Sequence, residues 1–211
     1  MSAAVHVVDD DAAVRRGLGL LLTGAGFEVR SYASAEAFLA ESGASPAGCL
    51  LLDVAMPGMS GLELQAVLAA RGVRLPVIFL TGHGDIPSSV RAMKDGAVEF
   101  LEKPVAGDVL IAAVRGALAL DAGRHADQTL RAAAQARYAT LTEREREIMA
   151  LAVAGLSNKL IARRLGISHR TIEIHRARAM RKMRAASLLE LAREARLCDL
   201  APPERQAPGE G

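Results

Sequence analysis

Residues 49–61 read Cys-Leu-Leu-Leu-Asp-Val-Ala-Met-Pro-Gly-Met-Ser-Gly, an apolar run that delivers one carboxylate, Asp53, and then breaks into a turn. A short apolar run of this kind is typical of a strand buried on both faces of a parallel sheet. In such sheets the reactive groups gather at the carboxyl ends of the strands. An isolated Asp in this place is more often a loop residue or a helix cap. A functional interpretation of Asp53 therefore requires partners from other strand ends.

Four other short apolar runs flank this stretch, and segments with helical spacing separate them. The five expected strands are residues 5–8, 27–30, 50–53, 76–81 and 98–102. Between them, apolar residues recur every three or four positions, which predicts helices at 12–25, 34–40, 60–70, 86–95 and 107–120. Because strand and helix alternate five times, we expect an α/β fold, a doubly wound five-stranded parallel sheet.

Polar side chains end four of the five strands. They are Asp9 with Asp10, Asp53, Thr81 and Lys103, and a parallel sheet brings them to one edge. Three crowded carboxylates raise one another's pKa unless a hard cation neutralises them. Oxygen ligands without His or Cys beside them favour Mg²⁺ over Zn²⁺. Asp53 is then the candidate nucleophile toward phosphorus, while Lys103 and Thr81 are placed to bind phosphoryl oxygens.

With these residues in this order, residues 3–120 resemble the receiver domain of a two-component response regulator, which has a flavodoxin-like fold. Thr81 follows Asp53 by 28 residues and Lys103 follows Thr81 by 22, and receivers place the hydroxyl and the lysine at such separations. The other matching features are Asp9-Asp10, Met56-Pro57-Gly58-Met59-Ser60-Gly61, Thr81-Gly82-His83-Gly84 and Phe100-Leu101-Glu102-Lys103-Pro104.

The resemblance implies a phosphoacceptor site. Asp53 would accept a phosphoryl group from the phosphohistidine of a sensor histidine kinase. Asp10, Asp53 and the Ala55 carbonyl would ligate Mg²⁺, with Asp9 acting mainly through water.

Three further residues near the expected site need an interpretation. Asp11 is interpreted as a solvated residue at a helix start. His83 either crowds the phosphoryl pocket or, more commonly, lies exposed in a loop. Phe100 is either plain core or the switching aromatic that receivers carry, and we favour the switch because Thr81 should lie beside it. Family structures also imply a cis bond before Pro104.

The composition divides the chain into two halves. A length of 211 residues suits one large domain or two small ones. The residues are 51% hydrophobic but only 3% aromatic. Residues 1–120 hold nine Lys/Arg against thirteen Asp/Glu, a formal charge of −4, whereas residues 121–211 hold seventeen against eleven, a charge of +6. An acidic half joined to a basic half predicts two domains whose partners differ, the basic one favouring polyanions.

The two cysteines, Cys49 and Cys198, lie in different halves without metal-ligand or CxxC spacing. A disulfide framework or a zinc site is therefore not expected, which fits a reducing compartment. The sequence shows no secretory leader pattern and no apolar run of membrane-spanning length. We expect a cytoplasmic protein with no membrane partner.

The segment between the halves favours helix. Residues 121–137 are rich in Ala, Gln and Arg and contain no Pro, which predicts a helical linker, separate from the preceding helix or continuous with it. Leu110, Val114 and Leu118 recur at helical spacing and either pair two receivers or, more commonly, pack on the receiver's own sheet. The tail, residues 198–211, is heavy in Pro, Glu and Gly and is expected to be disordered.

The basic half predicts an all-α domain of four helices. Thr142 followed by Glu145 is a capping-box pattern that begins a helix ending at Gly155. Three further helices are expected at 158–165, 168–183 and 187–196, and Ser157 and Ser168 cap the first two of them. A short helix, a turn containing Gly and a longer basic helix predict a helix-turn-helix.

The longer basic helix has two different faces. Its apolar side holds Ile172, Ala179, Met180 and Met183. The opposite side holds Arg170, Glu173, Ile174, Ala177, Arg178 and Arg181. This mixture suits the major groove, where Arg pairs with guanine, Glu accepts from cytosine, and Ile or Ala contacts a thymine methyl. Lys159 and Thr171 are better placed for phosphates.

Residues 138–197 resemble the LuxR-type helix-turn-helix of the NarL/FixJ class of response regulators. The matching features are Leu141-Thr142-Glu143-Arg144-Glu145, Gly155-Leu156-Ser157-Asn158-Lys159, Leu165-Gly166-Ile167-Ser168, Arg170-Thr171-Ile172-Glu173 and Met180-Arg181-Lys182-Met183. Leu160 departs from the Glu that many relatives carry. His175 is interpreted as a packed or phosphate-facing residue. The resemblance implies that the fourth helix pairs two domains on DNA, and the candidate pairing residues are Leu188, Leu191, Ala192 and Ala195.

Together the two resemblances predict a response regulator transcription factor that is not a turnover enzyme. Phosphorylation of Asp53 is expected to change the receiver face near residues 86–110 and to promote a homodimer. The dimer would present two basic domains to half-sites of double-stranded promoter DNA about one helical turn apart. RNA polymerase is a further expected partner.

Two alternatives stay open at this point. The first is an aspartate-nucleophile phosphatase that uses Asp53 and Mg²⁺, although Ala55 stands where its general acid belongs. The second is a receiver that acts as a protein-interaction module and carries a vestigial DNA domain.

Overall fold

The computed structural model describes residues 3–42, 46–82 and 92–200. The chain divides into two compact units, Met1–His125 and Ala126–Gly211, and each is described by itself. None of the helices in the described ranges combines the length and the apolarity that a bilayer crossing requires. His83, residues 86–91 of the predicted helix 86–95 and residues 201–211 of the predicted tail lie outside the described residues.

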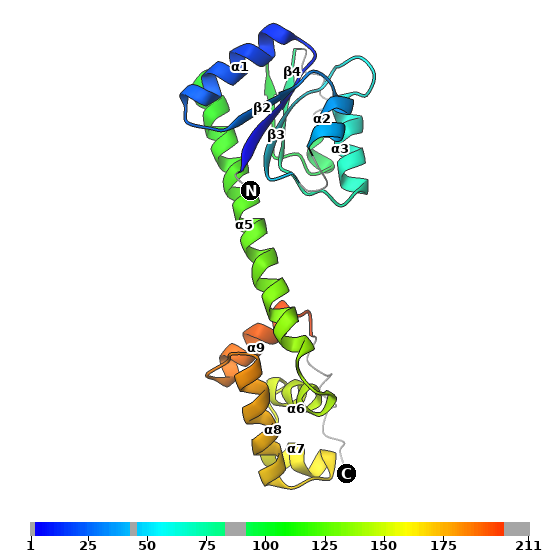
Figure 1. Ribbon diagram of the computed structural model, residues 1–211, viewed down its shortest axis with the longest axis vertical. Coiled ribbons are helices and arrows are strands. Elements are labelled where there is room, and N and C mark those ends of the chain that lie inside the picture. Colours follow the sequence, from blue (N-terminus) through cyan, green and yellow to red (C-terminus); the bar gives the residue numbers. More distant parts are fainter. Residues whose placement is uncertain (1–2, 43–45, 83–91, 201–211) are drawn as a thin grey trace. The chain divides into compact units, whose positions relative to one another are not determined.

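The first unit is built on a five-stranded parallel sheet in the order β2-β1-β3-β4-β5. The strands are β1 (Ala4–Val8), β2 (Val29–Tyr32), β3 (Gly48–Asp53), β4 (Val77–Thr81) and β5 (Glu99–Glu102). Helices cover both faces, with α1 (Ala12–Gly24) and α5 (Gly107–Ala139) on one side and α2 (Ala35–Glu41) and α3 (Gly61–Ala70) on the other (Figure 1). The predicted doubly wound sheet is confirmed.

Strand β3 is central and buried along its whole length. Leu50 and Leu52 pack into one core with α2 and α3. Cys49 and Leu51 pack into the other core with α1 and α5. This two-sided burial explains why the strand reads as a continuous apolar run rather than an alternating one.

Strand β2 begins and ends two residues later than predicted, so the range 27–30 is wrong. Its parallel pairing with β1 runs from Val29 to Tyr32, opposite Val5 to Val8. The Tyr32 ring packs edge-on against Phe38, with ring centroids 5.3 Å apart. Burial of this aromatic side chain extends the strand beyond the residues that the sequence pattern favoured.

Helix α5 contains the whole of the predicted linker, residues 121–137, without a break. The first compact unit extends past residue 120 to His125. Leu110 and Val114 are fully buried against the sheet, and Leu118 packs partly against the same core. These residues are therefore core of the first unit rather than a pairing surface.

Up to residue 200, where the described part of the chain ends, the second unit holds four helices after α5, namely α6 (Glu143–Val153), α7 (Asn158–Leu165), α8 (His169–Lys182) and α9 (Leu188–Leu197). Thr142 begins α6 with the predicted capping box, in which its hydroxyl accepts from the Glu145 N–H. Helix α7 ends at Gly166, whose φ of 64° is the left-handed conformation that glycine adopts without strain. Two adjacent cores hold the helices together, one beneath α7 and one beneath α9.

Candidate functional site

Three strand ends converge on one ammonium group. Lys103, directly after β5, donates from Nζ to Asp9 Oδ2 at 2.6 Å and to Asp53 Oδ1 at 2.5 Å. Asp9 follows β1 and is 2% exposed, and Asp53 ends β3 and is 7% exposed. The structure thus brings together residues that stand 94 and 50 positions apart in the chain.

Backbone N–H groups bind the other carboxylate oxygens. The Ala55 N–H donates to Asp53 Oδ2 at 2.9 Å, and the Asp11 N–H donates to Asp9 Oδ1 at 2.9 Å. Asp11 itself is exposed and caps α1, accepting from the Ala13 and Val14 N–H groups, as predicted for a residue at a helix start. In each buried carboxylate, one oxygen is therefore fixed by a backbone N–H and the other is available to a cation.

The charges at the site are strongly coupled. Burial raises the pKa of the Asp53 carboxyl, and the neighbouring Asp9 adds to this, although Lys103 acts in the opposite direction. Burial alone would lower the pKa of Lys103, but its hydrogen bonds to Asp53 and Asp9 outweigh burial and raise it. The ammonium group is therefore held in its charged form between two acids.

The donor set fits Mg²⁺. Within the described ranges, no three His, Cys, Asp or Glu side chains form a cluster ready to hold a metal. Mg²⁺, however, keeps several waters and needs only one or two protein carboxylates. Asp9 and Asp53 both bind the ammonium group of Lys103 and so lie close enough to share one cation. Asp10 lies exposed beside them. These oxygens are the ligands that Mg²⁺ prefers.

The other predicted residues of this site lie around the same edge of the sheet. Thr81 is the last residue of β4, is 6% exposed and accepts the Lys103 N–H through its carbonyl at 2.7 Å. Ala55 is exposed in the loop after Asp53. The peptide bond before Pro104 is cis, as predicted.

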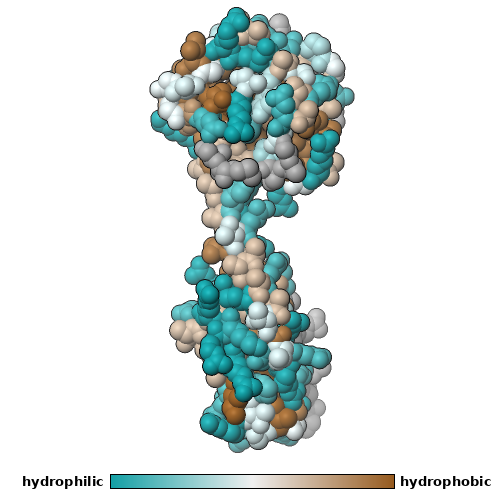
Figure 2. Space-filling view, in the orientation of Figure 1, coloured by the Kyte–Doolittle hydropathy of each residue, from teal (hydrophilic) through white to brown (hydrophobic). Residues whose placement is uncertain are grey.

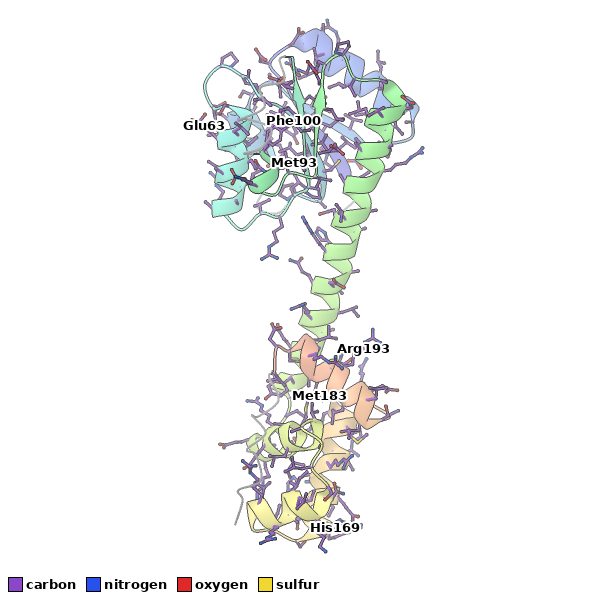
Figure 3. The ribbon with its side chains drawn as sticks, turned by 180° about the vertical axis from the view of Figure 1, so that it is seen from behind. Glu63, Met93, Phe100, His169, Met183 and Arg193 are labelled. Atoms are coloured by element: carbon purple, nitrogen blue, oxygen red, sulfur yellow. The ribbon has the colours of Figure 1, made fainter. Side chains whose placement is uncertain are left out.

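Phe100 is half-buried and packs against the core shared with α2 and α3. Its backbone pairs with Phe79, and the two ring centroids are 6.0 Å apart (Figure 3 labels Phe100). Glu102, and not Phe100, lies opposite Thr81 in the sheet register. Phe100 is therefore a diagonal neighbour of Thr81, and its switching role stays a prediction.

Two residues that the sequence did not single out hold the loops of the site. Arg15 donates from Nη1 to the Asp9 carbonyl at 2.7 Å. Glu36, in the first turn of α2, accepts the Met59 N–H at 3.0 Å and so fixes the loop that follows β3. Gly58 permits this approach, because a Cβ there would lie 3.0 Å from Glu36 Oε1. No local pattern predicts a contact between residues 23 positions apart.

The second unit presents a basic helix whose two faces are those predicted. Ile172, Ala179 and Met183 are fully buried. Figure 2 shows hydrophilic residues over much of the visible surface of this unit. The exposed or half-exposed residues of the predicted DNA surface are Lys159, Arg170, Thr171, Glu173, Ile174, Ala177, Arg178 and Arg181.

Some of these side chains are held by neighbours on the same helix. Glu173 binds Arg170 at 3.3 Å and lies 3.6 Å from His169, which Figure 3 labels at the start of α8. Arg176 donates to Asn158 Oδ1 at 2.7 Å and so links α8 to the first residue of α7.

The predicted pairing face of α9 requires a correction. Leu191 is fully buried and Ala195 is 2% exposed, and both pack into the core of their own domain with Met149 and Met183. They are core residues because the side of α9 that carries them faces α6 and α8. The exposed apolar residues of this helix are Leu188, at 37%, and Leu189, at 76%.

Comparison with known proteins assigns both units. Residues 5–115 match the response regulator receiver domain family, and residues 139–195 match the luxR family of bacterial regulatory proteins. The transcriptional regulatory protein FixJ of Azorhizobium caulinodans is 48% identical over 207 residues, covering 98% of each chain. The C4-dicarboxylate transport transcriptional regulatory protein DctR of Rhodobacter capsulatus is 46% identical and covers 92% of this chain and 99% of its own.

Solved structures agree with this assignment. The response regulator StyR aligns with a TM-score of 0.83 at 43% identity, covering 93% of this chain and 99% of its own. Full-length FixJ from B. japonicum aligns with a TM-score of 0.58 at 44% identity, covering 95% and 99%. The acidic edge lies in the receiver match and the basic helix lies in the luxR match, and relatives of nearly equal length are transcriptional regulators. The chain therefore belongs to the FixJ-type response regulators, transcription factors in which a receiver domain precedes a LuxR-type helix-turn-helix domain.

Proposed function

We propose that Asp53 is the phosphoacceptor through which a sensor histidine kinase controls this transcription factor. The observation that carries the proposal is the convergence of Asp9, Asp53 and Lys103 at the carboxyl edge of the sheet. In the transfer, an Asp53 carboxylate oxygen attacks phosphorus and the P–N bond to the kinase histidine breaks. The electron pair of that bond leaves with the imidazole, which takes a proton from solvent.

The residues around Asp53 have complementary parts in this reaction. Asp10, Asp53 and the Ala55 carbonyl, with Asp9 through water, would hold Mg²⁺, which when bound supplies positive charge against the phosphoryl oxygens. Lys103 provides a second positive charge close to Asp53 and exchanges its ion pair with that carboxylate for one with the phosphoryl group. Thr81 donates its hydroxyl to another phosphoryl oxygen, and Phe100 follows the movement of Thr81.

Phosphorylation adds close to two negative charges at this edge. We propose that the new charge promotes a homodimer, whose two basic domains bind half-sites of promoter DNA in the cytoplasm of a bacterium and present the complex to RNA polymerase. On each domain the exposed face of α9, with Leu188, Leu189 and Ala192, is the pairing surface on DNA. Arg170, Arg178 and Arg181 read base edges, whereas Lys159 and Thr171 bind phosphates.

The test compares the unsubstituted chain and the Asp53→Asn variant, each before and after treatment with acetyl phosphate. Acyl phosphate is measured by intact mass, and affinity is measured on a duplex selected by the phosphorylated chain from a random library. We expect the substitution to abolish both the acyl phosphate and the affinity gain, while Asp108→Asn, at an exposed acid of the same domain, keeps both. Equal affinity of the unsubstituted chain before and after treatment would refute the coupling.

Two further measurements on the same protein separate the alternatives. Steady turnover of a phosphate ester at Asp53 would identify a phosphatase instead. Failure to shift any genomic fragment, phosphorylated or not, would identify a vestigial DNA domain.

A further inference from the structure

Asp121 is a buried carboxylate that the phosphoacceptor chemistry does not use. It is 4% exposed and lies on α5, beyond residue 115, where the receiver family match ends. Its Oδ2 accepts the Gly48 N–H at 2.8 Å, and its Oδ1 lies 3.4 Å from His125 Nδ1. A buried carboxylate is costly unless it is hydrogen-bonded. The contact therefore has a defined geometry and is not a chance surface pairing.

The partner of Asp121 is the first residue of the phosphoacceptor strand. Gly48 begins β3, and Asp53 ends it. At Gly48 a Cβ would lie 1.9 Å from the Ala4 carbonyl oxygen, so this end of β3 is packed directly against the β1 backbone. Asp121 thus binds the amino end of the same six-residue strand whose carboxyl end carries the phosphoacceptor.

A second contact follows one turn later on the same helix. Arg124 donates from Nη1 to the Arg74 carbonyl at 3.0 Å, in the connection between α3 and β4. We call Asp121 and Arg124, with their partners Gly48 and Arg74, the amino-edge clasp. Both contacts lie inside the first compact unit, which ends at His125.

We propose that the amino-edge clasp carries the state of the receiver into α5, with Asp121 as its positioning residue. The inference rests on the proposed function, since it concerns how phosphorylation of Asp53 reaches the rest of the chain. Coupling between two sites requires an element that is held differently in the two states. The clasp is the contact through which β3 and the α3–β4 connection hold the part of α5 that continues to Ala139. Without it, that part of the helix is released from the receiver in both states.

The experiment uses the full chain with Asp121→Ala, Asp121→Asn and, as a matched control on the same helix, Asp127→Ala at an exposed acid. Acetyl phosphate is the phosphodonor, intact mass gives the extent of phosphorylation, and the selected duplex described above is the DNA probe. We expect the unsubstituted chain to gain at least about fivefold in affinity on phosphorylation, the lower end of typical allosteric couplings. Asp121→Ala should be phosphorylated normally and gain less than about twofold, because the coupling itself is removed.

Two comparisons distinguish this role from a merely structural one. Asp121→Asn keeps an oxygen that accepts from the Gly48 N–H and should retain the gain, as should the control at Asp127. Arg124→Ala removes the exposed half of the clasp without leaving a buried group unpaired, and it should reduce the gain even if Asp121→Ala fails to fold.

Four results would overturn the inference or its basis. A full affinity gain in both Asp121→Ala and Arg124→Ala removes the clasp from the coupling, as does a full gain in Arg124→Ala when Asp121→Ala does not fold. Loss of phosphorylation in parallel with loss of the gain would assign Asp121 to receiver folding alone. Absence of any gain in the unsubstituted chain would remove the proposed function, and this inference with it.

Discussion

The Lys182 ammonium of helix α8 lies 2.6 Å from a carboxylate oxygen of Glu145, the acid that closes the capping box of helix α6. Glu145 is only 2% exposed and also accepts the Thr142 N–H at 2.8 Å. One carboxylate therefore caps the N-terminus of α6 and links it to the last turn of α8. The buried pair holds these two helices of the second unit together.

Glu145→Gln should destabilise the second unit by about 2 kcal/mol, because it leaves Lys182 without its partner acid. Urea unfolding followed by circular dichroism measures the loss. Glu147→Gln on the same helix is the control, since its pair with Arg144 is exposed and contributes less than about 1 kcal/mol. Equal losses from the two substitutions would show that burial of the pair is unimportant.

The same bond predicts a pH dependence at the acid end. Burial acts to raise the pKa of Glu145, but hydrogen bonds from Lys182 and Thr142 outweigh it and hold the pKa below 4.5. The folded state therefore binds the proton less readily than the unfolded state, and the contribution to stability is present above pH 4.5. It is lost as the pH falls through the folded pKa. Unfolding midpoints of Glu145→Gln should accordingly vary less with pH in this range.

His6 predicts a second pH dependence, in the receiver. The ring is 2% exposed, stacks near Tyr32 and Phe38, and has a pKa lowered by burial from 6.5. Below pH 6.5 the His6 ring binds a proton in the unfolded chain more readily than in the folded chain. The free energy of unfolding therefore falls as the pH decreases, by at most about 1.4 kcal/mol per pH unit. His6→Gln should flatten this slope in urea unfolding at pH 7.5 and 5.5. An unchanged slope would assign the effect to another group.

Residues on the basic surface should differ in how they affect DNA binding. Arg178→Ala should weaken binding to the selected duplex by about 1–3 kcal/mol and relax its sequence preference, because Arg178 is placed to read bases. Lys159→Ala should weaken binding to all duplexes alike and reduce the salt slope by about one, as expected for a phosphate contact. Salt titrations with the selected duplex and a scrambled one measure both. Identical effects on the two duplexes would remove Arg178 from the base contacts.

The corrected pairing face of α9 can be tested with two leucines that stand two positions apart. Leu191→Ala should cost about 2–5 kcal/mol of folding stability, because its side chain is fully buried. Leu189→Glu should leave stability unchanged, since Leu189 is 76% exposed, but should weaken cooperative binding to a duplex with two half-sites. Thermal melts and band-shift titrations separate the two effects. Unchanged cooperativity in Leu189→Glu would move the pairing surface away from α9.

The sequence predicted the sheet and the acidic edge because both follow from short-range patterns. Asp53 and Thr81 stand directly at the ends of apolar runs, and parallel strands necessarily bring such ends together. The same reasoning did not find Asp121, since an acid in a polar, Ala-rich helix looks solvated until the start of β3 is placed against it. It also placed the buried Leu191 and Ala195 on the pairing face of α9 beside Leu188 and Ala192, because only the fold decides which of these apolar residues are buried.

Cys49, immediately after the clasped end of β3, has no exposed surface, and burial raises the pKa of its thiol to about 12. Thiolate is the form that alkylating reagents attack, so this sulfur is doubly protected while the receiver is folded. Cys198, partly exposed at the end of α9, belongs to the other unit. Labelling of Cys49 consequently reports the opening of the receiver, whereas the partly exposed Cys198 can be labelled while its own domain stays folded.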